Sequence, residues 1–243
     1  ERIIERTDDG SATLFVPELN EHYHSTKGAR TESQHIFIDM GLKASPAATP
    51  RVLEIGFGTG LNAWLTLEEA ERSRRNIHYI GLELYPLDWQ TVEQLGYISS
   101  DEQLTIHRKQ TTTDEQFTPN EEKQQSAIEL FKQLHTSPWE KDVQLTPHFT
   151  LRKIETDVNK WRVENSPFNL VYFDAFAPEK QPEMWSQELF NRLYVLLDRD
   201  GILTTYCAKG VVRRMLQTAG FTVERLPGPP GGKREILRAR KQE

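Results

Sequence analysis

The stretch Arg51–Gly60, RVLEIGFGTG, decides the fold of this chain. Its apolar run VLEI is typical of a short buried strand, and three glycines follow at alternate positions, Gly56, Gly58 and Gly60. Apolar residues at helical spacing begin directly afterwards, at Leu61. Glycine lets the backbone approach a ligand closely and adopt positive φ, and a helix N-terminus presents unpaired N–H groups. A strand, a glycine-rich turn and a helix in this order therefore predict a ligand-binding βα unit.

The spacing of the glycines discriminates between ligands. A dinucleotide-binding loop has the pattern G-x-G-x-x-G, which would need a glycine at position 61, where this chain has leucine. The pattern present is E-x-G-x-G-x-G, read from Glu54. It resembles the cofactor loop of class I S-adenosylmethionine-dependent methyltransferases. A nicotinamide or flavin site and a glycine-rich turn without a ligand are the alternatives.

Composition limits the class of protein. A length of 243 residues suits one domain, or one domain with a small appendage. The single cysteine, Cys207, excludes a disulfide within the chain and favours a reducing compartment. The charged N-terminal stretch has no apolar run of signal-peptide length, and no window approaches the ~20 apolar residues of a membrane span. We therefore expect a cytoplasmic protein without membrane contact.

The net charge of −6 is unevenly distributed along the chain. Residues 199–243 hold ten Lys or Arg against four Asp or Glu, a charge of +6, which leaves −12 for residues 1–198. A basic end on an acidic protein is typical of an RNA-facing surface, although an ordinary solvated surface has the same charge.

Residues 1–49 precede the first central strand and predict a small β-rich extension. Two runs of strand character, Arg2–Arg6 and Ala12–Val16, flank the turn Asp8–Gly10, as in a β-hairpin. A helix is expected over Thr31–Leu42.

The two histidines of this extension, His22 and His24, lie two residues apart. No third histidine or cysteine stands at ligand spacing from them, so we expect no metal site.

Residues 50–243 alternate between strand and helix patterns, which predicts an α/β fold with a doubly wound, mostly parallel sheet of seven strands. The strands are expected at Arg51–Ile55, Ile77–Leu84, His148–Thr156, Pro167–Phe173, Ile202–Cys207, Phe221–Leu226 and Glu235–Ala239. Helices are expected from Leu61 to about Arg75, over Asp88–Leu95, over Asn120–Leu134, from a cap at Ser186 to Leu196, and over Val211–Ala219. Residues 99–147 are polar and are interpreted as an insertion within this domain, and Asp200-Gly201 is expected to be a turn.

Three acidic residues, Glu83, Asp157 and Asp174, stand at or just after the ends of parallel strands. Ligands bind beyond the carboxyl ends of the strands in such sheets, so these acids should meet the glycine loop. Glu83 is placed to hydrogen-bond a ribose diol. In the class I methyltransferase architecture Asp157 would meet the adenine amino group, or it instead caps a helix. Asp174 opens a loop, AFAPEKQPEMW, whose two prolines prevent a continuous helix and which should cover the site.

Several stretches resemble one family closely. They are EIGFGTGLN at Glu54–Asn62, FDAFAPEKQPEMW at Phe173–Trp185, the C-terminal run RRMLQTAGFTVERLPGPPGGKREIL, and the segment Tyr23–Phe37. They are similar to the methyltransferase domain of the bifunctional tRNA 5-methylaminomethyl-2-thiouridine biosynthesis protein family, MnmC. The resemblance implies transfer of a methyl group from S-adenosylmethionine to the aminomethyl group on the wobble uridine of tRNA, giving 5-methylaminomethyl-(2-thio)uridine. The FAD-dependent oxidoreductase domain of bifunctional members, and hence FAD, is not expected, because the chain ends soon after the last strand.

The resemblance and the strand positions together define the expected site. Asp174 is the candidate catalytic residue, which would orient the amine and stabilise its developing positive charge. The expected cofactor-binding residues are Tyr23, Glu32, Glu54, Gly56, Phe57, Gly58, Thr59, Gly60, Asn62, Glu83 and Asp157. The expected substrate or RNA contacts are Phe176, which would pack on uracil or adenine, and Lys180, Lys209, Arg213, Lys233 and Arg234. A non-catalytic nucleotide-binding module, a nicotinamide oxidoreductase and a methyltransferase of small-molecule amines are the alternative functions.

Overall fold

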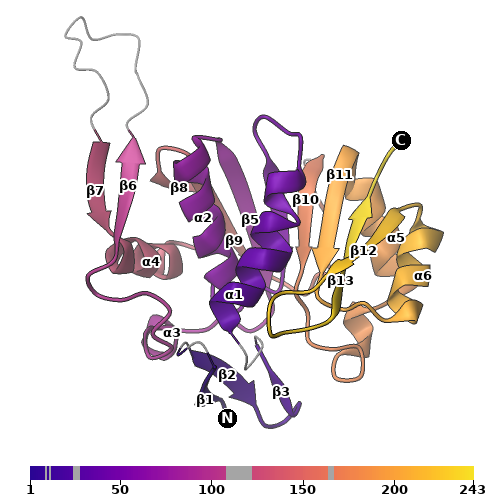
Figure 1. Cartoon of the computed structure of the whole chain (residues 1–243), viewed down its shortest axis with the longest axis horizontal. Coiled ribbons are helices and arrows are strands. Elements are labelled where there is room, and N and C mark those ends of the chain that lie inside the picture. The colour runs from indigo at the N-terminus through magenta and orange to yellow at the C-terminus, as the bar shows by residue number, and fades with distance from the viewer. Residues whose placement is uncertain (9, 11, 24–27, 108–121, 164–166) are drawn as a thin grey trace, which may run out of the picture.

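An eight-stranded sheet forms the centre of the molecule, with strand order β12-β13-β11-β10-β4-β5-β9-β8 (Figure 1). The computed structural model describes residues 1–8, 10, 12–23, 28–107, 122–163 and 167–243. The strands of this sheet are β4 (Arg51–Ile55), β5 (Ile77–Glu83), β8 (Val143–Thr146), β9 (Phe149–Glu155), β10 (Phe168–Phe173), β11 (Leu197–Thr205), β12 (Thr222–Pro227) and β13 (Glu235–Arg240). The predicted doubly wound, mostly parallel sheet is confirmed.

The strand order changes direction at the centre of the sheet. From β4 the chain adds β5 and β9 on one side, and then returns to add β10 and β11 on the other side. Such a switch point leaves a crevice at the carboxyl ends of the central strands, where no crossover connection fills the space. The glycine loop leaves β4 at this crevice.

The sheet has eight strands rather than the predicted seven. The additional strand is β8, which pairs antiparallel with β9 at the edge of the sheet. Its sequence, VQLT, is too short and too polar to stand out as a strand, and pairing with β9 rather than intrinsic preference explains its conformation.

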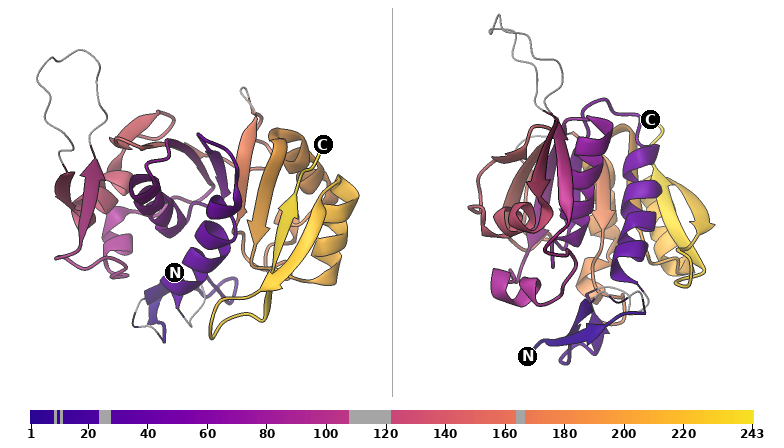
Figure 2. Two further views of the ribbon diagram at one scale, coloured as in Figure 1. Left: turned by 45° about the horizontal axis from the view of Figure 1, so that its top comes forward. Right: turned by 60° about the vertical axis from the view of Figure 1, so that its left-hand side comes forward.

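Side chains alternate along the central strands between two cores, as expected for a sheet buried on both faces. Val52 and Tyr79 belong to one core, whereas their neighbours Leu53 and Ile80 belong to the other. The helices of the first core are α1 (Ala29–Ser33), α2 (Leu61–Ser73) and α4 (Ala127–Thr136), and those of the second are α5 (Gln187–Leu196) and α6 (Gly210–Ala219) (Figure 2).

The predicted start of the helix over Asn120–Leu134 is wrong. Residues Glu122–Ser126 form strand β7, which pairs with β6 (Gln103–His107) in a separate hairpin, and α4 begins only at Ala127. Asn120 itself lies outside the described residues. The regular apolar spacing starts at Ala127, so only that part of the stretch can bury an apolar face.

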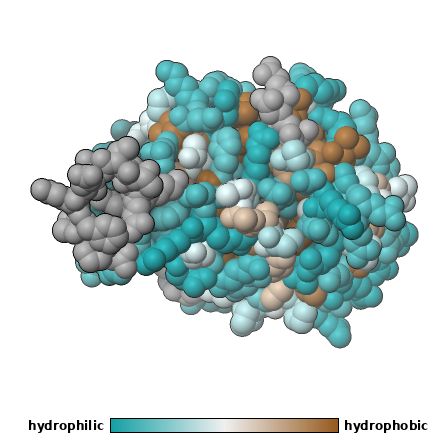
Figure 3. Space-filling view, turned by 90° about the horizontal axis from the view of Figure 1, so that it is seen from above, coloured by the Kyte–Doolittle hydropathy of each residue, from teal (hydrophilic) through white to brown (hydrophobic). Residues whose placement is uncertain are grey.

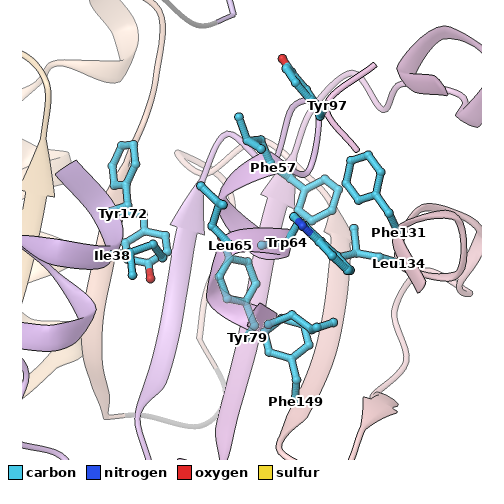
Figure 4. Packing of buried hydrophobic residues seen from close by; sticks show 14 of the residues in the cluster. Ile38, Phe57, Trp64, Leu65, Tyr79, Tyr97, Phe131, Leu134, Phe149 and Tyr172 are labelled. Atoms are coloured by element: carbon cyan, nitrogen blue, oxygen red, sulfur yellow. The ribbon is translucent and has the colours of Figure 1, made fainter. Parts of the chain in front are cut away.

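Helix α4, which lies within residues 99–147, packs into the main core. The aromatic ring of Phe131 packs edge-on against Trp64 of α2, at 5.8 Å between ring centroids. Leu134 and the glycine-loop residue Phe57 belong to the same cluster (Figure 4). The region therefore supports the loop that follows β4.

The helix expected over Thr31–Leu42 is shorter and less regular than predicted. It begins at Ala29, widens into a π-helix over Gln34–Asp39 and is followed by a 3₁₀ turn at Leu42–Ala44. The π-helical segment buries three consecutive apolar residues, Ile36 to Ile38, which a regular α-helix would distribute around more than half of its circumference.

The turn expected at Asp200-Gly201 is instead an irregularity inside β11. This strand already begins at Leu197, and its register with β10 shifts between Leu197 and Ile202. Asp200 adopts φ of 63°, a conformation in which the chain bulges without leaving the sheet.

The other predicted helices differ little from the structure. Asp88 is the N-cap of α3 (Trp89–Glu93), and Ser186 is the N-cap of α5, where its hydroxyl accepts a hydrogen bond from the Leu189 N–H at 3.1 Å.

The N-terminal residues form a three-stranded antiparallel sheet of β1 (Ile3–Arg6), β2 (Ala12–Val16) and β3 (Glu21–His22). The predicted hairpin is confirmed, whereas β3 was not predicted, and Asp9 and His24 lie outside the described residues. Figure 1 shows this small sheet at the lower end of the molecule, below α1.

The opposite end of the molecule is shown from above in Figure 3. Its visible surface is mostly hydrophilic, with small apolar patches between polar side chains. Over the described part of the chain, the helices are too short or too polar to cross a membrane. Within the same residues no group of three or more His, Cys, Asp or Glu is arranged to hold a metal ion.

Candidate active site

A cleft lies beyond the carboxyl ends of β4, β5, β9 and β10. It is lined by Gly56 and Gly58 of the glycine loop and by the three acids Glu83, Asp157 and Asp174. The structure thus brings together the residues that the sequence placed at four strand ends. Their roles toward a ligand stay predictions.

The Glu83 carboxylate braces the glycine loop. Its Oε2 atom accepts a hydrogen bond from the Gly58 N–H at 2.9 Å, and its Oε1 atom accepts one from the Tyr85 N–H at 3.1 Å. Burial raises the pKa of Glu83, and these N–H groups oppose the shift because they stabilise the anion. Each carboxylate oxygen has a second lone-pair direction, so Glu83 retains the capacity to accept hydrogen bonds from hydroxyl groups in the cleft.

Helix α4 supports the glycine loop from the opposite side. Gly60 has φ of 75°, and a Cβ atom built there would lie 2.8 Å from His135 Nε2 and 3.1 Å from Leu134 Cδ2. The glycine at this position is therefore required both by its backbone conformation and by the neighbouring helix. Contact with a ligand is not needed to explain it.

The rim of the cleft combines apolar and acidic groups. Leu84 and Tyr85 are 42% and 64% exposed at its edge, and Val158 and Met184 add further apolar lining. Asp157 lies among them, and its Oδ1 accepts a hydrogen bond from the Asn159 N–H at 2.9 Å in a turn rather than at a helix start. Apolar walls beside carboxylates suit a ligand with a flat heteroaromatic ring and a hydroxylated sugar.

The loop after β10 forms one wall of the cleft and is held by its own side chains. The Trp185 indole N–H donates to the Phe176 carbonyl oxygen at 2.7 Å, and the Phe176 N–H donates to Gln181 Oε1 at 3.2 Å. These contacts explain physically why tryptophan and glutamine stand in this proline-containing stretch.

The cleft includes only part of the predicted cofactor set. The predicted residues that line it are Tyr23, Gly56, Phe57, Gly58, Glu83 and Asp157. The side chain of Phe57 packs in the core against Gly81, and so this residue can offer the cleft little more than backbone. The predicted residues that do not line the cleft are Glu32, Glu54, Thr59, Gly60 and Asn62.

Asn62 and Glu54 lie behind the loop and contact Asp174 instead. The Asn62 Nδ2 group donates one hydrogen bond to Glu54 Oε2 at 2.8 Å and another to Asp174 Oδ2 at 3.0 Å. Burial raises the pKa of Glu54 well above its ordinary value, which favours its neutral form. Asn62 therefore orients Asp174 through a fixed amide, and Asp174 Oδ1 accepts no hydrogen bond from any described residue. The spacing of Glu54 and Asn62 across the loop was visible in the sequence, but we interpreted it as a cofactor contact.

A second cavity adjoins the cleft, and we call it the acceptor cavity. It is lined by Glu21, His22, Tyr23, Glu32, Ser33, Phe37, Asp174, Ala175, Phe176, Ala177, Tyr206 and Lys233. Tyr23, Asp174, Ala175 and Phe176 also line the cleft. The rings of Tyr23 and Phe176 meet edge-on, at 5.1 Å between centroids, and form a partition between the two spaces. Because Asp174 borders both, ligands in the two spaces would meet at its carboxylate.

Asp174 has an unusual affinity for protons. Burial, with a smaller contribution from the charge of Glu32, raises the pKa of Asp174 to about 7, and the Asn62 hydrogen bond opposes the shift. A carboxylate that titrates near neutral pH in a pocket is typical of a functional group.

The predicted RNA contacts are only partly brought together. Phe176 and Lys233 line the acceptor cavity, where Lys233 Nζ lies 4.8 Å from the centre of the Tyr206 ring. Lys209 forms an ion pair with Glu179. Lys180, Arg213 and Arg234 line neither the cleft nor the acceptor cavity.

Much of the positive charge of the C-terminal region is neutralised within the fold. Arg225 pairs with Glu235, and both Arg238 and Arg240 pair with Glu224. The exposed residues Lys233 and Arg234 lie in the connection between β12 and β13, which approaches α1 in Figure 1. Among the described residues, Arg199, Arg213, Arg214, Lys233 and Arg234 form no ion pair, so about half of the basic side chains of this region remain available to a partner.

The raised pKa of Asp174 predicts how a substitution changes stability. In the unfolded chain this carboxyl ionises near pH 4, whereas in the folded protein it ionises near pH 7, so stability falls as pH rises through this window. Asp174→Asn removes the ionisation, and we expect its melting temperature to exceed that of the wild type at pH 8 and the difference to shrink at pH 5. Thermal unfolding at both pH values tests this, with the exposed Asp198→Asn as control. A uniform loss of stability at both pH values would show instead that Asp174 holds the loop through its charge.

Comparisons with known proteins agree with this geometry. A family model described as S-adenosyl-L-methionine-dependent methyltransferase matches residues 118–242. The chain is 30% identical over 241 residues to the tRNA 5-methylaminomethyl-2-thiouridine biosynthesis bifunctional protein MnmC of Cupriavidus metallidurans, covering 96% of this chain and 33% of that protein. It is also 30% identical over 238 residues to the MnmC protein of Magnetococcus marinus, covering 93% of this chain and 32% of the relative. The chain thus spans about a third of the length of the curated relatives it matches.

A solved structure matches over nearly the whole chain. The crystal structure of MnmC2 from Aquifex aeolicus superposes with a TM-score of 0.71 and 25% sequence identity, covering 98% of this chain and 70% of that one. The family model matches just over half of the sequence, and the cleft beside the glycine loop suits the cofactor that its description names. This chain therefore belongs to the family of S-adenosyl-L-methionine-dependent methyltransferases.

Proposed function

We propose that this protein transfers a methyl group from S-adenosylmethionine to the aminomethyl group on the wobble uridine of tRNA. The observation that carries the proposal is the position of Asp174, at the junction between the cofactor cleft and the acceptor cavity. The names of the curated relatives supply the nucleoside, and a tRNA substrate accords with the cytoplasmic location expected from the single cysteine.

The cofactor would lie in the cleft, on the glycine loop. Glu83 would accept hydrogen bonds from the ribose hydroxyls, and Asp157 would accept one from the adenine amino group. Leu84 and Tyr85 would cover the adenine ring, which explains their exposure at the rim. When bound, S-adenosylmethionine supplies a methyl group on a positively charged sulfur, which an amine nitrogen takes up by displacement.

The protein contributes position and charge rather than covalent chemistry. Asn62 fixes Asp174 through Oδ2, which leaves Oδ1 to accept a hydrogen bond from the amine. As positive charge develops on the nitrogen, the Asp174 carboxylate stabilises it in place, without having to reorient. An ordinary carboxylate would also hold the amine in its protonated form, which cannot attack. The raised pKa of Asp174 weakens that effect, because the carboxyl group takes up a proton more readily.

Residues 1–49 belong to the proposed site rather than to a separate function. Tyr23 and Glu32 both come from this extension, and Tyr23 with Phe176 separates the two ligand spaces. We propose that the extension completes the acceptor side of the methyltransferase domain, residues 50–243.

A direct assay tests the function. Labelled S-adenosylmethionine is incubated with bulk tRNA from cells that lack the modification, and the nucleosides are then analysed. We expect label in 5-methylaminomethyl-(2-thio)uridine. Label in other nucleosides, or transfer only to free amines, would contradict the proposed substrate.

Asp174→Asn should retain binding and lose turnover. The amide keeps an acceptor oxygen but lacks the negative charge, so kcat should fall about 10²-fold or more, a loss of at least ~2.7 kcal/mol of transition-state stabilisation. Single-turnover rates on cofactor-saturated protein measure this, with Asp198→Asn as control. A rate near that of the wild type would remove the catalytic role of Asp174.

Glu83→Ala should weaken cofactor binding by roughly 1–3 kcal/mol, the range for hydrogen bonds to a charged group. Titration with S-adenosylhomocysteine measures the change, and Glu93→Ala on the exposed face of α3 is the matched control. Equal dissociation constants for the variant and the wild type would show that Glu83 does not contact the ligand.

Neutralising Lys233 and Arg234 together should weaken tRNA binding and flatten its salt dependence, because fewer counterions are released on binding. Replacement of the exposed Arg199 and Arg214 removes the same charge elsewhere in the C-terminal region and serves as control. If the two double variants lose affinity equally, the connection between β12 and β13 is not a specific RNA contact.

A further inference from the structure

The acceptor cavity has acidic groups on more than one side. Asp174 follows β10, Glu32 lies on α1 and Glu21 on β3, so three separate elements each bring a carboxyl group to it. Its remaining polar lining includes the phenol groups of Tyr23 and Tyr206, and the Tyr206 hydroxyl donates to the Ala175 carbonyl oxygen at 2.7 Å.

The basic side chains of the cavity have partners of their own. The imidazole Nε2 of His22 lies 2.6 Å from Glu5 Oε2, and Lys233 lies over the face of Tyr206. Lys233 is also exposed to solvent, which screens its charge. The lining thus holds three carboxyl groups, one lysine and one histidine, a set that suits a positively charged or strongly hydrogen-donating ligand.

The charge of Glu32 affects the ionisation of Asp174. It contributes to the raised pKa of Asp174, after burial, which places the two carboxyl groups within electrostatic reach of each other. A cation or an N–H donor between them would relieve this repulsion. Glu54 also faces Asp174, through Asn62, and burial raises the pKa of Glu54 well above its ordinary value, which favours its uncharged form.

We propose that Glu32 is the second carboxylate that binds the acceptor amine, and that Glu32 and Asp174 together select a protonatable amine over uncharged groups of similar size. The inference rests on the proposed function and specifies its acceptor side. A primary amine has two N–H bonds and one lone pair. If each carboxylate accepts one N–H bond, the lone pair is left to point toward the cofactor cleft, in the geometry that methyl transfer needs. The transfer forms the N–C bond, breaks the C–S bond, and leaves an additional proton on nitrogen, which passes to water as the product leaves.

Glu32→Gln tests this pairing, because it keeps the size of the side chain and removes its charge. The probes are two anticodon stem-loop RNAs, which carry an aminomethyl or a hydroxymethyl group on the same uridine. For the wild type we expect the aminomethyl RNA to bind at least tenfold more tightly than the hydroxymethyl RNA. In Glu32→Gln this ratio should fall below about threefold, and kcat/KM for the aminomethyl RNA should fall at least tenfold.

The pH profile separates a direct role from a structural one. Removing the charge of Glu32 should lower the pKa of Asp174. Where kcat/KM rises with pH because Asp174 loses its proton, that rise should therefore move to lower pH. Affinity for S-adenosylhomocysteine should stay within twofold of the wild type, which verifies the fold, and Glu32→Asp should recover part of the discrimination. Glu188→Gln, on the exposed side of α5, controls for the loss of one negative charge.

The outcomes distinguish this inference from the proposed function. If the wild type transfers no methyl group to aminomethyl RNA, the proposed function fails. If the wild type does so and Glu32→Gln keeps the same discrimination, efficiency and pH profile, the role of Glu32 is overturned while the function stands.

Discussion

The carboxamide of Asn62 is the interaction on which the rest of the site depends. One amide nitrogen supplies both of its hydrogens to acidic side chains, Glu54 from inside the first central strand and Asp174 from the end of its neighbour. Two full negative charges on one buried amide are costly, and burial raises the pKa of Glu54 well above its ordinary value, which favours its neutral form. The carboxylate that we propose to be catalytic is thus attached to the centre of the sheet by a side-chain hydrogen bond. This rigidity is what a displacement reaction requires, because a small misplacement of the reacting atoms costs much of the rate.

The sequence was sufficient for the parallel strands of the sheet and for the three acids around the cleft. Alternation of apolar runs with helical spacing predicts the parallel strands, and the rule that ligands bind at their carboxyl ends brings Glu83, Asp157 and Asp174 together. Strand β8 and the hairpin of β6 and β7 could not be predicted, because their residues are polar and adopt strand geometry only through their pairing partners.

The division of the site into two spaces also could not be predicted. Motif positions in a sequence indicate which residues approach a ligand region, but not on which side of an aromatic partition each will lie. Glu32 and Tyr23 both precede the glycine loop in the sequence and were assigned to the cofactor. In the structure Tyr23 stands between the two spaces, whereas Glu32 lines only the acceptor cavity. The ion pairs of the C-terminal arginines with Glu224 and Glu235 also could not be predicted from the sequence. The acids that neutralise these arginines lie on the neighbouring strand, beyond the turn.

The contact between Gly60 and α4 has a consequence for how this protein can vary through evolution. His135 occupies the space that a side chain at position 60 would need, and its own position is fixed by Lys153, whose ammonium group donates to the His135 carbonyl oxygen at 2.6 Å and lies over the Trp139 ring. Position 60 therefore excludes a larger residue on two grounds, the positive φ of its backbone and the neighbouring side chains of His135 and Leu134. Helix α4, whose sequence carries no cofactor motif, thus limits which residues the glycine loop can contain during evolution.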